Sequence, residues 1–514
     1  MTAAVPFGAG PATRLSAATL AAVLPRPHVT GPPPGDLGRD LGVLHLGIGA
    51  FHRAHQAVWT EDAAAAAGEQ GWGICGVTQR SATVADQLQP QDCRYGVLER
   101  HRDGATLRVV GQVAEVLYPA RDAARLTARF TDPAVRVISL TVTEKGYHRR
   151  GDGRLDLDAP AVAADLAGPG GPAGRGGLAG RVPRSSVGLL VRGLQARAAA
   201  SDAPVTVLTC DNLTGNGRVL AGLVGDFCAA LPAGEGDRLA DWIARRVTFP
   251  SSMVDRIVPA TTDADRADAA ALLGLTDEGL VVAEPFRQWV IEDTFAAARP
   301  AWDRVGVELV DDVAPHEQLK LRVLNGTHST LAYLGALAGY ATIAEAVRDP
   351  ELAATAEALI TEDVLPTLTP PAGVDVAAYG RTVLARFADP ALRHRTTQIA
   401  MDGSQKLPLR LLGTVRDARA AGRTPRHAIR GVAAWMAYVT AGRSRDGAPL
   451  PLDDPIADRL RAAVAGARGA AAVVTALLAV REVFPADLAA DPVVTACLTE
   501  ELARLGSTLP GADL

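Results

Sequence analysis

The sequence predicts an α/β protein in which an N-terminal domain of alternating strands and helices precedes a mostly helical C-terminal domain. The chain of 514 residues is too long for one ordinary hydrophobic core. Short apolar and β-branched runs recur up to about residue 283, and long Ala/Leu-rich segments dominate from about residue 284 onward. We therefore expect an irregular lead-in over residues 1–40, an α/β domain over residues 41–283 and a helical domain over residues 284–505.

Individual elements follow from local patterns. An apolar strand at residues 43–46 leads into a glycine turn and a helix at 56–66, and a second strand is expected at 73–77. Further strands are expected at residues 107–116, 135–143 and 204–210. The Gly/Pro-rich stretch 168–180 is expected to be a loop. The predicted C-terminal helices cover residues 317–337, 351–363, 427–440 and 457–480.

Composition and charge exclude several classes of function. Hydrophobic residues make up 48% and charged residues 21% of the chain, as in globular proteins. The net charge of −5 does not favour nucleic acid as a partner. The longest apolar run, near residues 470–480, is too short to cross a bilayer, and the N-terminus lacks the pattern of a signal peptide. We expect a cytoplasmic protein that binds neither nucleic acid nor a membrane.

The five cysteines suggest neither a disulfide framework nor a zinc site. They are odd in number, widely spaced and never arranged as CxxC. We expect them to be small buried hydrophobic residues and expect no metal. They are Cys75, Cys93, Cys210, Cys228 and Cys497.

The glycine turn after the first strand is the first candidate binding site. Gly47 and Gly49 suit a dinucleotide pyrophosphate at the start of a helix, the arrangement of a Rossmann-type domain. His52 stands where the third glycine of that motif is usual, so an ordinary tight turn remains an alternative. Arg53 could reach a phosphate or only cover the surface. Residues 78–81, after the second strand, include no acid to bind a ribose, so NAD and NADP both remain open.

Lysine is rare in this chain. Only three of the 52 basic residues are lysine, namely Lys145, Lys320 and Lys406. Arginine serves wherever a positive charge suffices, but it cannot release its proton near neutral pH. The three lysines are therefore candidates for lysine-specific chemistry, with chance or tight packing as the alternative.

Lys320 shares a predicted helix face with other polar residues. At ~100° per residue, Glu317 lies near 60°, His328 near 80° and Asn325 near 140° from Lys320. Carbonyl reduction needs a proton donor, hydrogen bonds to the developing alkoxide and a group that tunes the donor. These residue types can supply all three, although a solvated polar face would show the same spacing.

Polar residues also follow two predicted strands. Asp211 and Asn212 come after the strand at 204–210, and Glu144 and Lys145 come after the strand at 135–143. Ligands of α/β proteins bind outside the carboxyl ends of the strands, so both pairs are candidates for ligand contact. A simple Asx turn is the alternative for Asp211 and Asn212.

Five separated motifs together resemble the polyol-specific long-chain dehydrogenase/reductases, a family that includes mannitol 2-dehydrogenase and fructuronate reductase. The resemblance extends over roughly residues 40–500. The motifs occupy residues 45–55, 139–144, 210–212 and 253–257, followed by the lysine, asparagine and histidine at positions 320, 325 and 328.

The resemblance implies a nicotinamide-dependent, metal-independent dehydrogenase with specific residue roles. Lys320 would be the general acid/base, Asn212 and Asn325 the oxyanion hole, and His328 the residue that positions the reacting oxygen. Three acids would surround the lysine and serve its protonation and substrate binding: Glu144, Asp255 and Glu317. The cofactor, NAD with NADP not excluded, would lie against Gly47, Ile48, Gly49, Ala50, Phe51 and Arg53.

Two stretches resemble the fructuronate reductase branch. Mannitol dehydrogenases tend to have arginine at the position of Gln398 and glycine at that of Lys145. A lysine would bind the carboxylate that fructuronate has and fructose lacks, so we expect Lys145, with Lys406 or Arg395, to contact the substrate. The predicted reaction is reversible reduction of D-fructuronate to D-mannonate.

Open alternatives are a mannitol 2-dehydrogenase or another polyol or sugar-acid dehydrogenase, a zinc-dependent enzyme, and a nicotinamide-binding regulatory protein. The oligomeric state is also open, with a monomer among the options.

Overall fold

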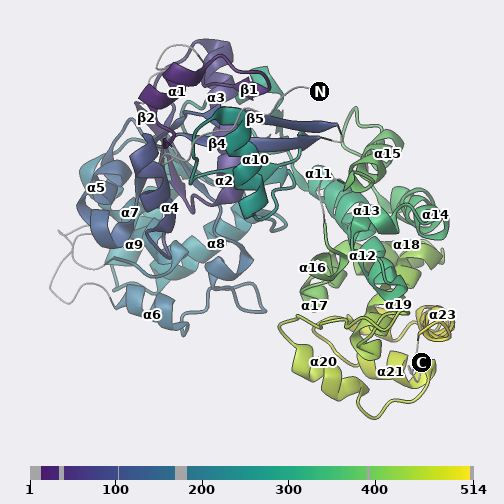
Figure 1. The fold of residues 1–514 in the computed structure, drawn as a ribbon. Coiled ribbons are helices and arrows are strands. Elements are labelled where there is room, and N and C mark those ends of the chain that lie inside the picture. The colour runs from purple at the N-terminus through teal and green to yellow at the C-terminus, as the bar shows by residue number, and fades with distance from the viewer. Residues whose placement is uncertain (1–12, 34–39, 102, 168–181, 391–393, 510–514) are drawn as a thin grey trace, which may run out of the picture. The chain divides into compact units, whose positions relative to one another are not determined.

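A computed structural model describes residues 13–33, 40–101, 103–167, 182–390 and 394–509 of the chain (Figure 1). The chain forms two compact units, Met1–Val313 and Ala314–Leu514. The first is a Rossmann-type α/β unit and the second is mostly helical, so the predicted fold class is confirmed. The division falls after Val313 and not after residue 283, because two strands beyond residue 283 belong to the same sheet as β10 (Ser252–Asp255) of the first unit. These strands are β12 (Gln288–Glu292), antiparallel to β10, and β13 (Glu308–Val310), parallel to β12.

The main sheet of the first unit is parallel and has the strand order β6-β3-β2-β7-β8-β9. The chain builds one half of the sheet outward from β2 and then returns to build the other half from β7. The carboxyl ends of β2 and β7 therefore flank the point where α/β sheets bind ligands. The strands are β2 (Leu41–Leu46), β3 (Gly73–Val77), β6 (Val113–Leu117), β7 (Val137–Leu140), β8 (Val205–Thr209) and β9 (Val247–Thr248).

Both faces of this sheet are buried, as near-continuous apolar strands require. Leu44 packs in the core on one face, and Val43, its neighbour in β2, packs in the core on the other. Helix α3 (Gln56–Ala67) packs on the Val43 side, where residues of two shorter helices, around Ala54 and Leu88, join the same core. The helices on the Leu44 side are α5 (Pro119–Thr131), α7 (Ser186–Ala200), α8 (Asn216–Ala229) and α9 (Glu235–Arg246).

A second sheet has the order β1-β5-β4-β11 and includes an antiparallel hairpin. The single strand predicted at residues 107–116 is wrong, because the chain turns at Gly111 and Gln112 and its two halves enter different sheets, as β5 and β6. The strands are β1 (Val29–Thr30), β4 (Tyr95–His101), β5 (Gly104–Val110) and β11 (Val281–Ala283).

The lead-in is not wholly irregular. Helix α1 (Ala17–Val23) begins after the capping residue Ser16, whose hydroxyl accepts a hydrogen bond from the Thr19 amide. Leu20 of this helix packs in a small core with Leu98 and Leu107. The predicted loop at 168–180 lies outside the described residues. The remaining helical segments of the unit are α2 (Ala50–Ala54), α4 (Thr83–Leu88), α6 (Pro160–Leu166), α10 (Asp263–Leu273), and the 3₁₀ turns η1 (Gln89–Gln91), η2 (Glu144–Tyr147) and η4 (Trp302–Val305).

The second unit is built around two buried helices, α12 (Thr327–Ala338) and α19 (Arg426–Ala441), which pack against each other. The predicted helix at 457–480 is two helices, separated at Gly466–Gly469. The other helical segments are α11 (Ala314–Leu319), α13 (Ile343–Ala346), α14 (Pro350–Ala358), η7 (Leu365–Thr367), α15 (Val376–Phe387), α16 (Thr396–Ile399), α17 (Gly403–Leu407), α18 (Gly413–Ala420), α20 (Ala457–Val464), α21 (Ala470–Leu478), α22 (Ala486–Ala489) and α23 (Pro492–Gly506).

Three π-helical turns interrupt the helices among the described residues of this unit. The turn η5 (Lys320–Gly326) joins α11 to α12 and packs against the other two, η6 (Leu359–Val364) and η9 (Pro408–Leu412). The predicted helices at 317–337 and 351–363 are therefore helical but not regular. Wide turns of this kind are rare and occur frequently at functional sites.

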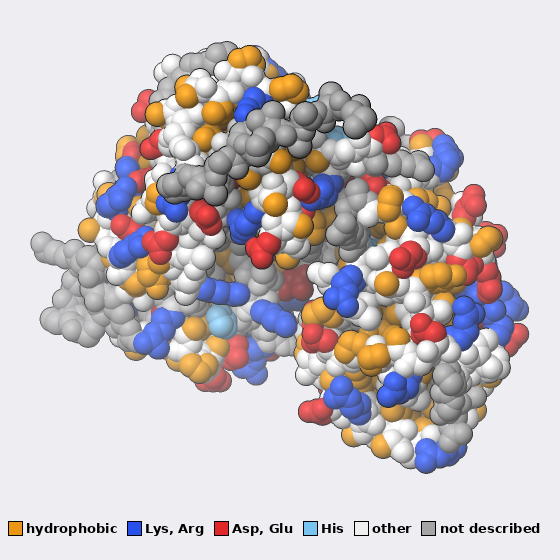
Figure 2. Space-filling model, in the orientation of Figure 1, with side chains coloured by type: hydrophobic (Ala, Val, Ile, Leu, Met, Phe, Trp, Pro, Cys, Tyr) orange, Lys and Arg blue, Asp and Glu red, His pale blue; other side chains and the backbone are white. Residues whose placement is uncertain are grey.

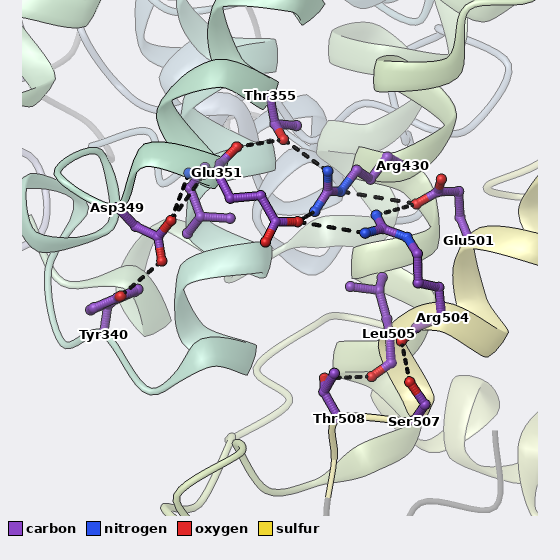
Figure 3. A network of polar contacts seen from close by, with 11 residues as sticks. Tyr340, Asp349, Glu351, Thr355, Arg430, Glu501, Arg504, Leu505, Ser507 and Thr508 are labelled. Carbon is purple, nitrogen blue, oxygen red and sulfur yellow. Dashed lines mark hydrogen bonds and ion pairs between the residues drawn. The ribbon is translucent and has the colours of Figure 1, made fainter.

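A polar network ties the C-terminal helix α23 to α14 and α19 (Figure 3). Arg430 of α19 pairs with Glu351 of α14 and donates to the Thr355 hydroxyl at 3.0 Å. Arg504 of α23 lies 3.5 Å from Glu351 and 2.7 Å from Glu501. Because several charges share partners here, the network fixes the last helix better than isolated surface pairs would.

On the face shown in Figure 2, acidic and basic side chains are interspersed. Within the described part of the chain, every helix falls short of the length and apolarity that a membrane span requires.

Candidate functional site

The glycine turn at the end of β2 packs tightly against the neighbouring strand β3 and the segment after β7. Gly47 has a φ of +97°, and a Cβ atom there would clash with the Thr141 carbonyl oxygen. Ile48 packs down on Gly76 of β3, where a Cβ would clash with the Ile48 side chain. Gly49 is exposed and immediately precedes α2. Glycine is therefore required at residue 47 for the turn, and the backbone at residue 49 is open to a close-lying ligand.

Arg53, predicted to contact a phosphate, is 6% exposed. Its guanidinium donates to the carbonyl oxygens of Gly49, at 3.2 Å, and Gly279. The same group lies 5.6 Å from the centre of the Tyr95 ring. These contacts hold Arg53 within the first unit and brace the turn, while its contact with a cofactor stays a prediction.

His52, at the position of the missing third glycine, is part of a buried histidine pair. Its ring stacks on that of His45 with 3.4 Å between centroids. His45 Nδ1 lies 2.8 Å from Ser139 Oγ, and Nε2 lies 2.9 Å from Thr141 Oγ1. Burial lowers the pKa of His45 to about 3 and the pKa of His52 well below its ordinary value. Both rings are therefore neutral at physiological pH.

This pair makes stability depend on pH. Below pH 6.5 the unfolded chain binds a proton at His45, whereas the folded chain binds it only near pH 3. The free energy of unfolding is therefore highest above pH 6.5 and decreases as the pH falls toward 3. The expected loss is about 1.4 kcal/mol per pH unit for each such histidine. Chemical denaturation at several pH values over a range of ~3 pH units, from about 4.5 to about 7.5, followed by tryptophan fluorescence, measures the slope of the free energy of unfolding against pH.

His45→Gln should make that slope shallower, whatever its effect on stability at neutral pH. The matched control is His28→Asn, at an exposed position with a φ of 61°, which asparagine tolerates. If the free energy of unfolding of His45→Gln depended on pH as steeply as that of the wild type and the control, His45 would not be buried in its neutral form.

The residues after β3 leave the choice of cofactor open. Thr78 donates to the Ser81 carbonyl at 2.8 Å, and Gln79 accepts from Ser186 at 2.8 Å. Arg80 is exposed. The packed glycine turn at the switch point of the sheet fits a dinucleotide, but no acid stands at residues 78–81 to favour NAD over NADP.

The structure brings the two predicted strand-end pairs together. β7 and β8 are adjacent, with Leu140 opposite Thr209. Glu144 and Lys145 are exposed in η2, just after β7, and Asn212 is exposed just after β8. The Asp211 carboxylate bonds to the loop after β7 and is not confined to a local Asx turn. In contrast, Asp255 ends β10 and is only 5% exposed.

Lys320 is buried at the start of the π-helical turn η5. It is 7% exposed, and Glu317, at the end of α11, is 5% exposed. The hydrogen bonds of a π-helical turn join residues five apart, as Lys320 and Asn325 are. A π-helical turn is wider than the regular helix from which the 140° separation between Lys320 and Asn325 was predicted, so that angle does not apply to this segment.

His328, one turn further, lies in a basic environment. Its ring stacks on Phe387 at 4.6 Å, and its buried Nε2 has no hydrogen-bond partner among the described residues. Arg410 donates to Ser329, the next residue, at 3.0 Å. Burial, followed by nearby basic side chains, lowers the pKa of His328 well below its usual value, so the ring is neutral. These side chains are His394, whose own pKa burial lowers to about 4, and the cationic Arg410, Lys406 and Arg386.

Three predicted substrate residues lie near one another on α16 and α17. Arg395 is exposed and caps α16, and Gln398 is exposed within it. Lys406, in α17, is half-buried and donates to the Ile399 carbonyl at 3.4 Å. Sequence reasoning missed Arg386 and Arg410, because arginine is common in this chain and nothing local distinguishes these two.

The described residues include no group of three or more His, Cys, Asp or Glu side chains arranged to hold a metal ion. All five cysteines are free thiols, and four of them are buried.

Two family models match the chain. The mannitol dehydrogenase Rossmann domain matches residues 41–304, and the mannitol dehydrogenase C-terminal domain matches residues 312–506. The chain belongs to the mannitol dehydrogenase family. It is an oxidoreductase, and the predicted resemblance is confirmed.

Similar proteins of this family include enzymes with different substrates in their names. The D-mannonate oxidoreductase of Escherichia coli K12 is 41% identical over 87% of this chain and 89% of its own. The uncharacterized oxidoreductase YdfI of the same strain is 43% identical over 89% of this chain and 91% of its own. A ternary complex of Pseudomonas fluorescens mannitol 2-dehydrogenase with NAD and D-mannitol superposes with a TM-score of 0.81, at 34% identity, covering 96% of this chain and 98% of the other.

The two domains of the mannitol dehydrogenase family meet between residues 304 and 312 of this chain, close to the structural division after Val313. The Rossmann domain of the family indicates a nicotinamide cofactor, which the packed Gly47 turn suits.

Proposed function

We propose that this mannitol dehydrogenase family member reduces D-fructuronate to D-mannonate with NADH, reversibly and without a metal. The observation that carries the proposal is the basic environment of His328, formed by Lys406, Arg410 and Arg386. Fructuronate and mannonate have a carboxylate that fructose and mannitol lack, and basic side chains recognise carboxylates through charge-assisted hydrogen bonds. The 41% identity with a D-mannonate oxidoreductase supports the same substrate class.

The proposed roles follow from the chemistry of each side chain. A bound nicotinamide would supply the hydride. Lys320 would donate its proton to the carbonyl oxygen as that oxygen becomes an alkoxide, and in the reverse direction it would remove the proton. Asn212 and Asn325 would donate hydrogen bonds to the same oxygen, where they act mainly on the developing charge. Neutral His328 would use its buried Nε2 to position that oxygen.

Three carboxylates would support this chemistry. We assign Glu317, Glu144 and Asp255 to the protonation of Lys320 and to hydrogen bonds with substrate hydroxyls. Glu317 belongs to the same helical segment as Lys320, three residues before it, and both are buried. An acid close to a buried lysine favours its protonated form, which is the form required for reduction.

The second candidate function is mannitol 2-dehydrogenase. It is favoured by the superposition on the Pseudomonas fluorescens enzyme, which covers 98% of that chain. The same lysine, asparagines and histidine would serve fructose and mannitol. The two functions differ in whether a basic side chain must neutralise a substrate carboxylate, which a single substitution can test.

Lys145→Met should depress kcat/KM for fructuronate by about 10- to 150-fold and leave residual fructose reduction nearly unchanged. The reason is that a charge-assisted hydrogen bond to a carboxylate contributes ~1.5–3 kcal/mol, whereas a neutral sugar has no such partner. Lys145 is exposed in η2 beside Glu144, where it can meet a ligand at the end of β7. Initial rates of NADH oxidation with each sugar measure the effect.

Arg150→Met is the matched control, because it removes another exposed positive charge shortly after Lys145. It should change both rates by less than about twofold, as surface substitutions usually do. Equal losses on fructuronate and fructose in Lys145→Met would show that Lys145 only holds its loop.

A further inference from the structure

Asp211, at the end of β8, links the two loops that present Glu144 and Asn212. Its carboxylate accepts hydrogen bonds from the backbone amides of Val142 and Thr143, both at 2.9 Å, and from the Tyr147 hydroxyl at 2.7 Å. These donors span η2, so one carboxylate closes the loop that holds Glu144. Asp211 therefore fastens the loop after β7 to the end of β8.

The backbone of Asp211 is held as firmly as its side chain. Its carbonyl oxygen accepts from the Leu213 amide at 2.8 Å and from the Asn216 side chain at 2.9 Å. Asn216 also donates to the Ser252 carbonyl at 2.8 Å. Asn212, between the fixed residues Asp211 and Leu213, has little freedom to move.

Tyr147 works together with Asp211, and we call the two residues the clamp, because both join the loop after β7 to β8 and the residues that follow it. Its hydroxyl lies 2.5 Å from Thr209 Oγ1, in β8, as well as 2.7 Å from Asp211. Burial raises the pKa of Tyr147 well above its ordinary value, so the phenol keeps its proton and can donate it to the carboxylate. The Tyr147 ring is 1% exposed and belongs to the core of the first unit, which anchors the end of η2.

The segment that the clamp holds is strained. Thr143 has φ +70° and ψ 157°, a region that glycine occupies and β-branched residues avoid. Such a conformation persists only when the surroundings impose it, and the Asp211 carboxylate binds the amide of this very residue. Without Asp211, Thr143 would relax and the direction of Glu144, the next residue, would change.

We propose that Asp211 and Tyr147 are positioning residues, which hold Glu144 and Asn212 in their working orientations without touching the substrate. This inference rests on the roles proposed above for Glu144 and Asn212. It makes Asp211 more important for turnover than for cofactor binding. A displacement of about 1 Å at a reacting centre costs on the order of 100-fold in rate.

The test compares Asp211→Asn with Asp165→Asn in the full-length protein. Asp165, on α6, is a matched carboxylate: it accepts from the amides of Arg184 and Ser185, at 2.7 and 2.8 Å, and from the Ser185 hydroxyl at 2.6 Å. Each asparagine replaces one acceptor oxygen with a donor, so both variants should lose stability. Only Asp211→Asn should lower kcat, by about 10- to 100-fold, with the Kd for NADH within about threefold.

Amide hydrogen exchange gives a readout that does not depend on turnover. Peptides covering residues 142–147 should exchange faster in Asp211→Asn and not in Asp165→Asn, because two amides lose their acceptor. If Asp211→Asn does not fold, Tyr147→Phe removes one hydroxyl, and kcat should fall by about fivefold. Unchanged exchange in residues 142–147, or a kcat within twofold of wild type in the folded variants, overturns the proposal.

Failure of the proposed function would look different. If the wild-type protein reduced none of the sugars offered, the assignment of the reaction would fail, while faster exchange confined to residues 142–147 would still support the clamp. If fructose replaced fructuronate as substrate, the kcat comparison would be made with fructose.

Discussion

Lys320→Arg is expected to abolish NADH-dependent sugar reduction, with a loss of about 10²–10⁴-fold, although it preserves the positive charge. Guanidinium does not release its proton near neutral pH, so it cannot act as the acid or the base. Lys320 is 7% exposed at the start of η5, where a water molecule has little access to replace it. Steady-state kcat measures the effect, and NADH fluorescence checks that the cofactor still binds.

The matched control is Arg322→Lys, the reverse substitution two residues after Lys320. Arg322, in the same π-helical turn, pairs with Asp417 and donates to Thr367. Arg322→Lys retains a charge there and should retain kcat within a few-fold. Turnover by Lys320→Arg at a rate comparable to that of Arg322→Lys would exclude Lys320 as the proton-transfer residue.

Asn212→Ala and Asn325→Ala should each lower kcat by about 10²–10³-fold and change cofactor affinity little. Donors aimed at a developing oxyanion stabilise the transition state more than the ground state, so their loss appears in kcat. Separate kcat and KM values for both variants provide the measurement. An effect on KM alone, with kcat intact, would make the asparagines ground-state binding residues.

Local sequence patterns predicted the centre of the first unit well. The strand expected at residues 73–77 is β3, and the helix expected at 56–66 is α3 (Gln56–Ala67). Buried parallel strands and glycine turns leave a signal within a few residues, because both faces of the strand are apolar and the turn needs glycine. Glu144 and Asn212, each expected to follow a strand, come after the adjacent parallel strands β7 and β8.

Features that depend on distant contacts were missed. Helix α1 lies in a stretch that appeared irregular, because Leu20 packs against residues of β4 and β5 that the local sequence does not reveal. The turn η5 was predicted as part of a regular helix. The periodicity of apolar residues does not distinguish a π-helical turn from an α-helix, and the contact of η5 with η9 is too distant in sequence to be predicted.

The same reason explains the residues missed at the site. Asp211 was recognised at a strand end, but its bonds to Val142 and Thr143 require the pairing of β7 with β8. Arg410 lies beside Ser329 only in the folded unit. Sequence spacing identifies residue types suited to a reaction, and long-range packing determines which other residues hold them.

The most direct test of the proposed function is the kcat/KM of the wild-type protein for D-fructuronate and D-fructose, measured with NADH and NADPH in the presence of EDTA. We predict reduction of fructuronate with NADH, favoured over fructose by about 10-fold or more, as expected from one charge-assisted hydrogen bond to the carboxylate. A preference for fructose would move the protein to the mannitol 2-dehydrogenase branch, and the absence of NADH oxidation with either sugar would contradict the assignment as a fructuronate reductase.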